Sequence, residues 1–160
     1  EDIIRFAELG VIPSMQATHA TSDKNMAEDR LGPVRIQGAY AWRKLLDSGA
    51  RIANGSDFPV EHPNPFYGLH ASVTRQDQQS NPAGGWYGGE RMTLEEALAS
   101  FTIDAAYAGH QEAHLGTLEP GKKADFILLD RDIFTQSPTQ MWQTQVQETW
   151  VDGVRVSVQN

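Results

Sequence analysis

Apolar and polar residues alternate along the first third of the chain in a pattern that switches between helical and strand spacing. Apolar side chains over residues 2–9 recur at helical spacing, and they predict a helix that ends at a glycine. The apolar run 11–15 predicts a buried strand, and the polar residues 16–20 predict a loop at its exit. The pattern repeats with a helix at 38–48 and a short strand at 51–54. Helices that alternate with strands indicate a parallel sheet, so the predicted fold class is α/β.

Capping signals predict further helices after the second strand, over residues 64–75, 94–101 and 103–108. Asn64 followed by proline suits an N-cap and first turn. Thr93 and Glu96 have the spacing of a capping box. The glycine-rich segment 76–91 lies between these helices and predicts a long loop, which in a compact domain is often functional.

The end of the chain follows a different plan. Residues 124–129 predict a strand, and an Asp-Gly pair between Val151 and Val154 predicts a hairpin. Beyond that turn Val154, Val156 and Val158 alternate, which predicts that the three valines share one face of a strand. We therefore divide the chain into a helix-and-strand part, 1–112, and a β part, 113–160.

Composition excludes several kinds of protein and site. The 160 residues include no cysteine, so a disulfide scaffold, a cysteine-bound zinc and a thiol nucleophile are excluded. The 13 basic and 21 acidic residues give a net charge of −8 with no basic cluster, so we expect no nucleic-acid partner. No apolar run approaches the roughly 20 residues that cross a bilayer, so we expect no membrane partner. The compartment is left open, with the cytoplasm slightly favoured.

Two polar side chains follow the two predicted strands in the same relative position. Asp57 comes directly after the second strand, where a carboxylate can bind a metal or accept a proton from water. His19 follows the first strand, so a parallel arrangement would direct both side chains into one mouth. The alternatives are that Asp57 caps its own Gly-Ser-Asp turn and that His19 is a surface residue. No histidines form an HxH or HExxH motif, the patterns by which one strand or helix supplies two metal ligands.

Other polar and aromatic residues are candidates with structural alternatives. Arg43 and Arg75 lie on helices beside the site loops, where each could bind a substrate carboxylate or merely pair with a neighbouring acid, the interpretation we favour. Trp86 and Tyr87, between paired glycines, could form a mobile lid or an aromatic plug that pins the loop.

Five segments in register resemble the carboxyl-terminal part of the family-3 amidohydrolases. They are VIPSMQATHA at 11–20, AYAWR at 39–43, GSDFPV at 55–60, TRQD at 74–77 and LGTLEPGKKADF at 115–126. The resemblance covers nearly the whole chain and implies a metal-dependent hydrolase. Its implied fold is the last two βα units of a TIM-like barrel, followed by a small β segment of a composite β-sandwich.

The resemblance also implies roles for residues. Asp57 matches the aspartate that binds the metal and activates water, and His19 matches a histidine that contacts substrate. Arg43 and Arg75 would anchor a small amide-like substrate. The implied cofactor is a divalent metal, zinc before others, whose remaining ligands lie upstream of Glu1, so the isolated chain would lack a complete site and activity. We also expect its uncovered strand edges to cause self-association.

Two other classes of function stay open from the residues alone. One is a module that binds a small molecule or a partner chain without catalysis. The other is a sugar- or nucleotide-binding α/β domain, which carries little weight because no glycine-rich phosphate loop opens a helix.

Overall fold

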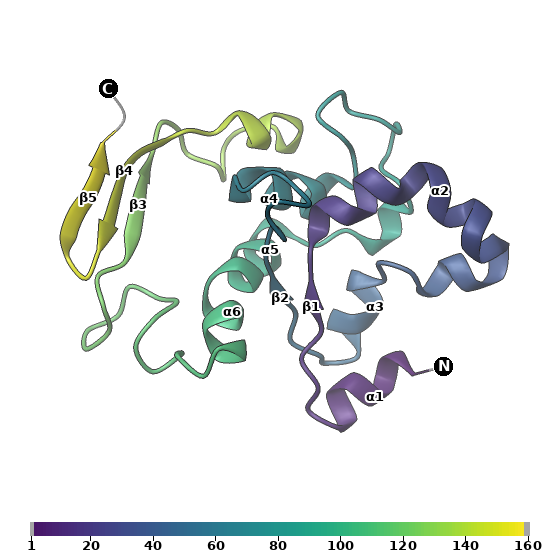
Figure 1. The fold of residues 1–160 in the computed structure, drawn as a ribbon, viewed down its shortest axis with the longest axis horizontal. Coiled ribbons are helices and arrows are strands. Elements are labelled where there is room, and N and C mark those ends of the chain that lie inside the picture. Colours follow the sequence, from purple (N-terminus) through teal and green to yellow (C-terminus); the bar gives the residue numbers. More distant parts are fainter. Residues whose placement is uncertain (1, 159–160) are drawn as a thin grey trace.

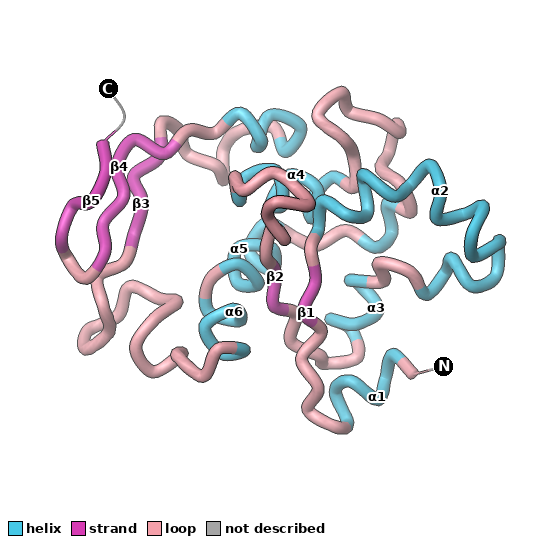
Figure 2. The backbone as a smooth tube through the Cα atoms, in the orientation of Figure 1, coloured by secondary structure: helices cyan, strands magenta, loops and turns pink. Residues whose placement is uncertain are grey.

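A computed structural model describes residues 2–158 (Figure 1). Helices surround a short two-stranded sheet at the centre, and a separate three-stranded sheet lies to one side (Figure 2). None of the helices among these residues is both long and apolar enough to cross a membrane. The mixture of helices and strands agrees with the predicted α/β class.

The central sheet consists of β1 (Ser14–Met15) and β2 (Ala53–Asn54), which run parallel. Their predicted positions and direction are confirmed, although both strands are shorter than the apolar runs suggested. Backbone hydrogen bonds extend the pair at both ends, from the Ala53 amide to Pro13 O and from the Gly55 amide to Met15 O, each at 3.1 Å. The two chain segments that leave this sheet therefore begin at the same edge.

The helix α2 (Ala17–Arg35) corrects the expectation of a polar loop at residues 16–20. The helix buries only small side chains on its inner face, including Ala17, Ala20 and Ala27, and packs against α4. A stripe of alanines separated by charged residues gives almost no apolar periodicity, so the pattern of large apolar side chains did not reveal this helix. Gly32, at φ 71°, and the proline after it interrupt the helix near its end.

The other helices agree with their predicted positions: α1 (Ile3–Glu8), α3 (Trp42–Asp47), α4 (Pro65–Thr74), α5 (Leu94–Phe101) and α6 (Ile103–Ala108). Asn64 caps α4 by accepting a hydrogen bond from the Phe66 amide at 3.0 Å. Both hydrogen bonds of the Thr93–Glu96 capping box are present. Short 3₁₀ helices lie at Ile36–Gly38, Gly88–Glu90 and Pro138–Gln143.

The core lies between the central strands and the helices that follow them, and its fully buried members include Trp42, Ile52, Phe66 and Ala97. Helices α4 and α5 approach closely at Gly68, where a Cβ atom would lie 2.5 Å from Cζ of Phe101. This close packing fixes α5 behind β2, which it also contacts.

The second sheet contains β3 (Phe126–Leu129), β4 (Val146–Val151) and β5 (Val154–Val158) in antiparallel order β3-β4-β5. The predicted hairpin is confirmed, but the prediction that its three valines share one face is wrong. Val154 pairs with Val151, and Val158 pairs with Glu148. Because Val151 and Glu148 are three residues apart on β4, their side chains face opposite sides of the sheet, and so do those of Val154 and Val158. The cause is a register shift between Thr149 and Trp150, because a bulge residue breaks strict alternation.

The segment before β4 returns to the helices. The 3₁₀ helix Pro138–Gln143 packs against α4 and buries Met141 almost completely. His70 of α4 is fully buried there, with Nδ1 3.1 Å from Pro138 O and Nε2 3.1 Å from Asp77 O. Tyr67 of α4 contacts Trp142 at a ring-centroid distance of 6.0 Å. The β part of the chain is therefore attached to the helical part through α4.

Candidate active site

His19 and Asp57 lie together at the carboxyl ends of the two central strands. His19 is in the first turn of α2, directly after β1, and Asp57 follows β2 by three residues. The Nε2 atom of His19 lies 3.5 Å from Oδ2 of Asp57. The structure thus brings together the two side chains that the sequence predicted to share a mouth, with His19 on a helix rather than in a loop.

The turn that carries Asp57 leaves its carboxylate available. Asp57 has φ 59°, a left-handed conformation, and its carbonyl oxygen accepts a hydrogen bond from the Val60 amide at 2.8 Å. The Phe58 amide donates to Oγ of Ser56 instead. Within residues 2–158 no group donates a hydrogen bond to the Asp57 carboxylate, whose side chain is 48% exposed. The alternative that this carboxylate merely caps its own turn therefore does not apply.

The ring nitrogen of His19 is also without a hydrogen-bond partner in the described part of the chain. Its Nε2 is covered although the side chain is 24% exposed. A carboxylate oxygen and an imidazole nitrogen this close can bind one cation together or exchange a proton. Residues 2–158 contain no group of three or more histidine, aspartate or glutamate side chains arranged to hold a metal. A metal ion bound between these two side chains would therefore need further ligands.

Arg43 joins α3 to α5. Its guanidinium forms a two-pronged pair with the Glu96 carboxylate and donates to Arg91 O at 3.0 Å. Hydrogen bonding to Arg43 lowers the pKa of Glu96, and Glu96 raises the pKa of Arg43. The acid-pairing interpretation explains these contacts, so the expectation that Arg43 anchors substrate finds no support in its position.

Arg75 is fully buried and cannot face an open mouth in this structure. Its guanidinium lies between the rings of Trp42 and Trp86, at 4.3 and 5.3 Å, and donates to the carbonyls of Trp86 and Tyr40. Burial lowers its pKa to about 10, so it stays charged at neutral pH. The expectation of a substrate anchor at Arg75 therefore finds no support, and its partners are carbonyls and rings rather than the neighbouring acid that we favoured.

The loop 76–91 is pinned by the same arginine. Trp86 is 7% exposed, its amide donates to Arg75 O at 2.8 Å, and its indole nitrogen donates to Glu28 at 2.9 Å. Gly85 passes so close to the end of α4 that an added Cβ would lie 2.3 Å from Thr74 O. These contacts fit the aromatic plug rather than the mobile lid.

Asn54 is a residue that the sequence analysis missed. It is the last residue of β2, three positions before Asp57, and its side chain is buried against α5. Its Nδ2 donates to Oγ of Ser100 at 2.8 Å. The signal that could have found it is a polar residue at the end of a buried strand, directly before the Gly-Ser-Asp turn.

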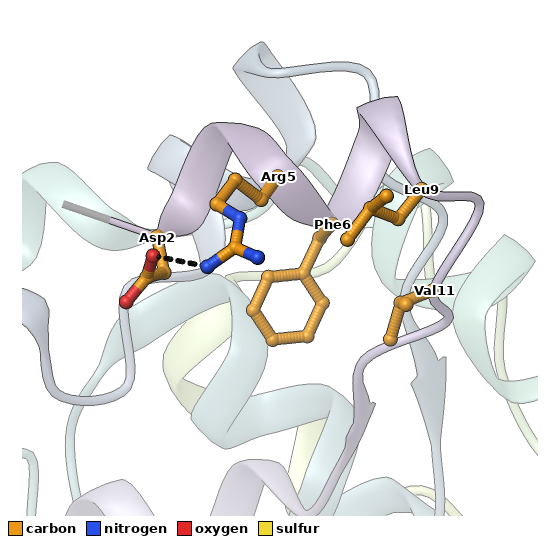
Figure 3. A pocket seen from close by; sticks show the side chains of 5 residues that line it. All are labelled: Asp2, Arg5, Phe6, Leu9 and Val11. Carbon is orange, nitrogen blue, oxygen red and sulfur yellow. Dashed lines mark hydrogen bonds and ion pairs between the residues drawn. The ribbon is translucent and has the colours of Figure 1, made fainter.

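A small apolar hollow of about 210 Å³ lies at the other end of the strands (Figure 3). It is lined by Phe6, Leu9 and Val11, with an Asp2–Arg5 ion pair of 2.8 Å at its rim. Because α1 leads into the amino end of β1, this hollow is remote from the strand ends that carry His19 and Asp57. We therefore do not assign it to the candidate active site.

Comparison with known proteins gives matches over almost all of the chain. A family model described as "Amidohydrolase family" matches residues 1–157. The protein LONG AFTER FAR-RED 3 of Arabidopsis thaliana is 36% identical over 126 residues, which are 78% of this chain and 21% of that protein. The N-substituted formamide deformylase of Arthrobacter pascens is 33% identical over 112 residues, 70% of this chain and 20% of that enzyme.

Solved structures agree with the sequence matches. An uncharacterized metal-dependent hydrolase from Pyrococcus horikoshii has a TM-score of 0.75 and 27% identity, over 86% of this chain and 28% of the hydrolase chain. The chain thus spans between a fifth and three tenths of the length of these relatives.

Proposed function

This chain belongs to the amidohydrolase family, and from that premise we propose that it forms the carboxyl-terminal part of a metal-dependent hydrolase of C–N bonds. The observation that carries the proposal is the 3.5 Å approach of His19 Nε2 to Asp57 Oδ2 at the carboxyl ends of two parallel strands. In barrels built from such strands, catalytic groups gather at that end. The substrate class is a small amide or related compound, in keeping with the formamide deformylase among its relatives.

Asp57 has the main role in this proposal. Its carboxylate has a free lone pair on each oxygen and is half exposed, so it can accept the proton of an attacking water. His19 lies beside the carboxylate, with Nε2 3.5 Å from Oδ2, and would contact the substrate. Both groups belong to segments that leave the paired strands β1 and β2 at the same edge.

Asp57 would hold a divalent cation, zinc before others, together with ligands from a segment outside this chain. A hard, exposed carboxylate without a hydrogen-bond donor suits that role, and His19 stands close enough to support it. Such an ion lowers the pKa of bound water towards 7 and polarises a carbonyl. The two groups fall short of the three protein ligands that a catalytic zinc site uses, so the isolated chain should be inactive.

A module that binds small molecules or a partner chain without catalysis is the second candidate. The observation in its favour is that the described residues contain no three-ligand group. The two candidates differ in a direct test on the full-length protein loaded with zinc, assayed against simple formamides and acetamides.

The test compares Asp57→Asn with Asp29→Asn, a change at an exposed aspartate of α2. We expect Asp57→Asn to lower kcat at least 100-fold, because Asn keeps the shape but cannot accept a proton. Asp29→Asn should leave kcat unchanged. A wild-type protein that hydrolyses no amide would support the binding module, and a tenth of wild-type kcat in Asp57→Asn would remove the role of Asp57.

A further inference from the structure

We infer that Asn54 and Ser100 are positioning residues that hold the Asp57 turn against α5. The importance of this inference for catalysis rests on the proposed function, since Asp57 is the group being positioned. The hydrogen bonds themselves do not depend on the proposed function. We call the Asn54 and Ser100 side chains together the strand-end latch.

The strand-end latch is a continuous buried chain of hydrogen bonds. Asn54 Nδ2 donates to Ser100 Oγ at 2.8 Å, and Ser100 Oγ donates to Ala97 O at 2.6 Å. Asn54 is 8% exposed and Ser100 is 2% exposed. The Ser100 hydroxyl therefore donates its proton to a carbonyl of α5 and accepts a hydrogen bond from Asn54. These two bonds link the end of β2 to the helix behind it.

On its other side β2 forms backbone hydrogen bonds with the β1 segment. β2 is two residues long, and the amide of Gly55, directly after the strand, bonds across to Met15 O. The turn at Asp57 begins immediately afterwards and is closed by the Val60 amide. The strand-end latch thus attaches the residue three positions before Asp57 to α5.

Helix α5 is a rigid support for this attachment. The Thr93–Glu96 capping box fixes its first turn, and Glu96 is also clamped by Arg43 of α3. At its other end Phe101 packs on Gly68 of α4 with no space for a Cβ atom. Because α5 is held at both ends, its hydrogen bond to Asn54 fixes where the end of β2 lies. The end of β2 in turn sets where the Asp57 turn begins.

The strand-end latch also leaves one buried polar atom without a hydrogen bond, which destabilises the folded state. The Oδ1 atom of Asn54 is buried, and within residues 2–158 it has no hydrogen-bond partner. A buried unsatisfied carbonyl oxygen destabilises the folded state, and an apolar side chain of the same size would remove that penalty. An apolar side chain would also lose the bond to Ser100, through which the amide nitrogen sets where the strand end lies relative to α5.

Hydrogen exchange of the Val60 amide measures this positioning directly, because that amide bonds to Asp57 O. In the 160-residue chain we expect Ser100→Ala and Asn54→Ala each to speed exchange at Val60 about fivefold, as for the loss of one buried hydrogen bond. The double variant should exchange no faster than either single one. Ser100→Thr keeps the hydroxyl and should retain wild-type exchange.

The matched control is Thr102→Val, which removes another hydroxyl-to-carbonyl bond of α5, to Leu98 O, without touching β2. It should leave exchange at Val60 unchanged. Equal acceleration in Thr102→Val, or additive effects of Asn54→Ala and Ser100→Ala, would show general loosening and overturn the inference. If Asn54→Ala does not fold, Ser100→Ala and its Thr rescue decide the question.

A kinetic measurement on the full-length protein separates positioning from stability. Ser100→Ala should lower kcat about tenfold and leave KM within twofold, since substrate binding does not need the proton transfer to Asp57. Unchanged kcat together with faster exchange at Val60 would overturn the role for catalysis. If the wild-type protein hydrolyses no amide, the proposed function fails while the exchange measurement still decides the latch.

Discussion

Replacing Gly85 with alanine tests whether the loop 76–91 is pinned to the end of α4. Gly85 has φ +83°, and a Cβ atom there would lie 2.3 Å from Thr74 O and 3.0 Å from Cβ of Arg75. The neighbouring Gly84 has φ +77°, and nothing lies within 4 Å of its virtual Cβ. The two positions share the backbone strain of a left-handed residue, and only Gly85 adds a steric clash.

The expected costs follow from that difference. A left-handed conformation costs an alanine about 1–2 kcal/mol relative to glycine. Forcing an atom into a packed region adds about 1–3 kcal/mol, and here the obstacle is a backbone carbonyl that a side-chain rotation cannot relieve. Gly84→Ala should therefore lower the free energy of unfolding by about 1 kcal/mol, and Gly85→Ala by about 3 kcal/mol.

Urea denaturation followed by tryptophan fluorescence measures both values, since Trp86 lies next to the substitution. In a thermal melt, we expect the melting temperature of Gly85→Ala to fall about 4–8 °C below that of Gly84→Ala. Equal losses for the two variants would mean that the loop moves away from Thr74 at little cost. That result would refute the interpretation of the loop 76–91 as an aromatic plug and would favour the mobile lid.

Three further outcomes can be measured on the isolated chain. Calorimetry should detect zinc binding weaker than about micromolar that Asp57→Ala removes, and tighter one-to-one binding would contradict the incomplete site. Glu96→Gln keeps a capping-box side chain but loses the ion pair with Arg43. Because Arg43 lowers the folded-state pKa of Glu96, the stability from this pair is present above the ordinary value of 4.5 and is lost as the pH falls through the lowered value. Melting temperatures of the variant and wild type should differ at pH 7, and the difference should shrink as the pH falls below 4.5. Sedimentation should show self-association that Val156→Lys on the exposed strand β5 reduces, and a wild-type monomer at every concentration would contradict it.

The sequence predicted the elements whose signals are local. Caps at Asn64 and Thr93, the Asp-Gly hairpin and the strand before Asp57 each need only a few neighbouring residues, and the structure has all of them. The pairing of His19 with Asp57 was also predictable, because parallel neighbours direct their carboxyl ends to the same edge. The roles of these two residues in a reaction remain a proposal.

The features that the sequence did not predict depend on contacts between distant segments. Arg75 is buried by Trp42 and Trp86, which lie 33 and 11 residues away, and no local pattern distinguishes it from an exposed arginine. Helix α2 is buried through alanines whose small side chains leave a weak periodic signal. The bulge in β5 depends on how β4 and β5 pair, which strict alternation of valines conceals.

The docking of Pro138–Gln143 on α4 has a consequence for how this chain can be shortened. His70 directs both ring nitrogens at carbonyl oxygens that α4 does not supply, one from Pro138 and one from Asp77. A chain cut after residue 112 would keep His70 and lose Pro138. The imidazole ring of His70 and the surface that Met141 covers would then be exposed to solvent. The carboxyl-terminal segment therefore covers a face of α4, and a proteolytic nick near residue 112 should leave the two pieces associated rather than release a free helical fragment.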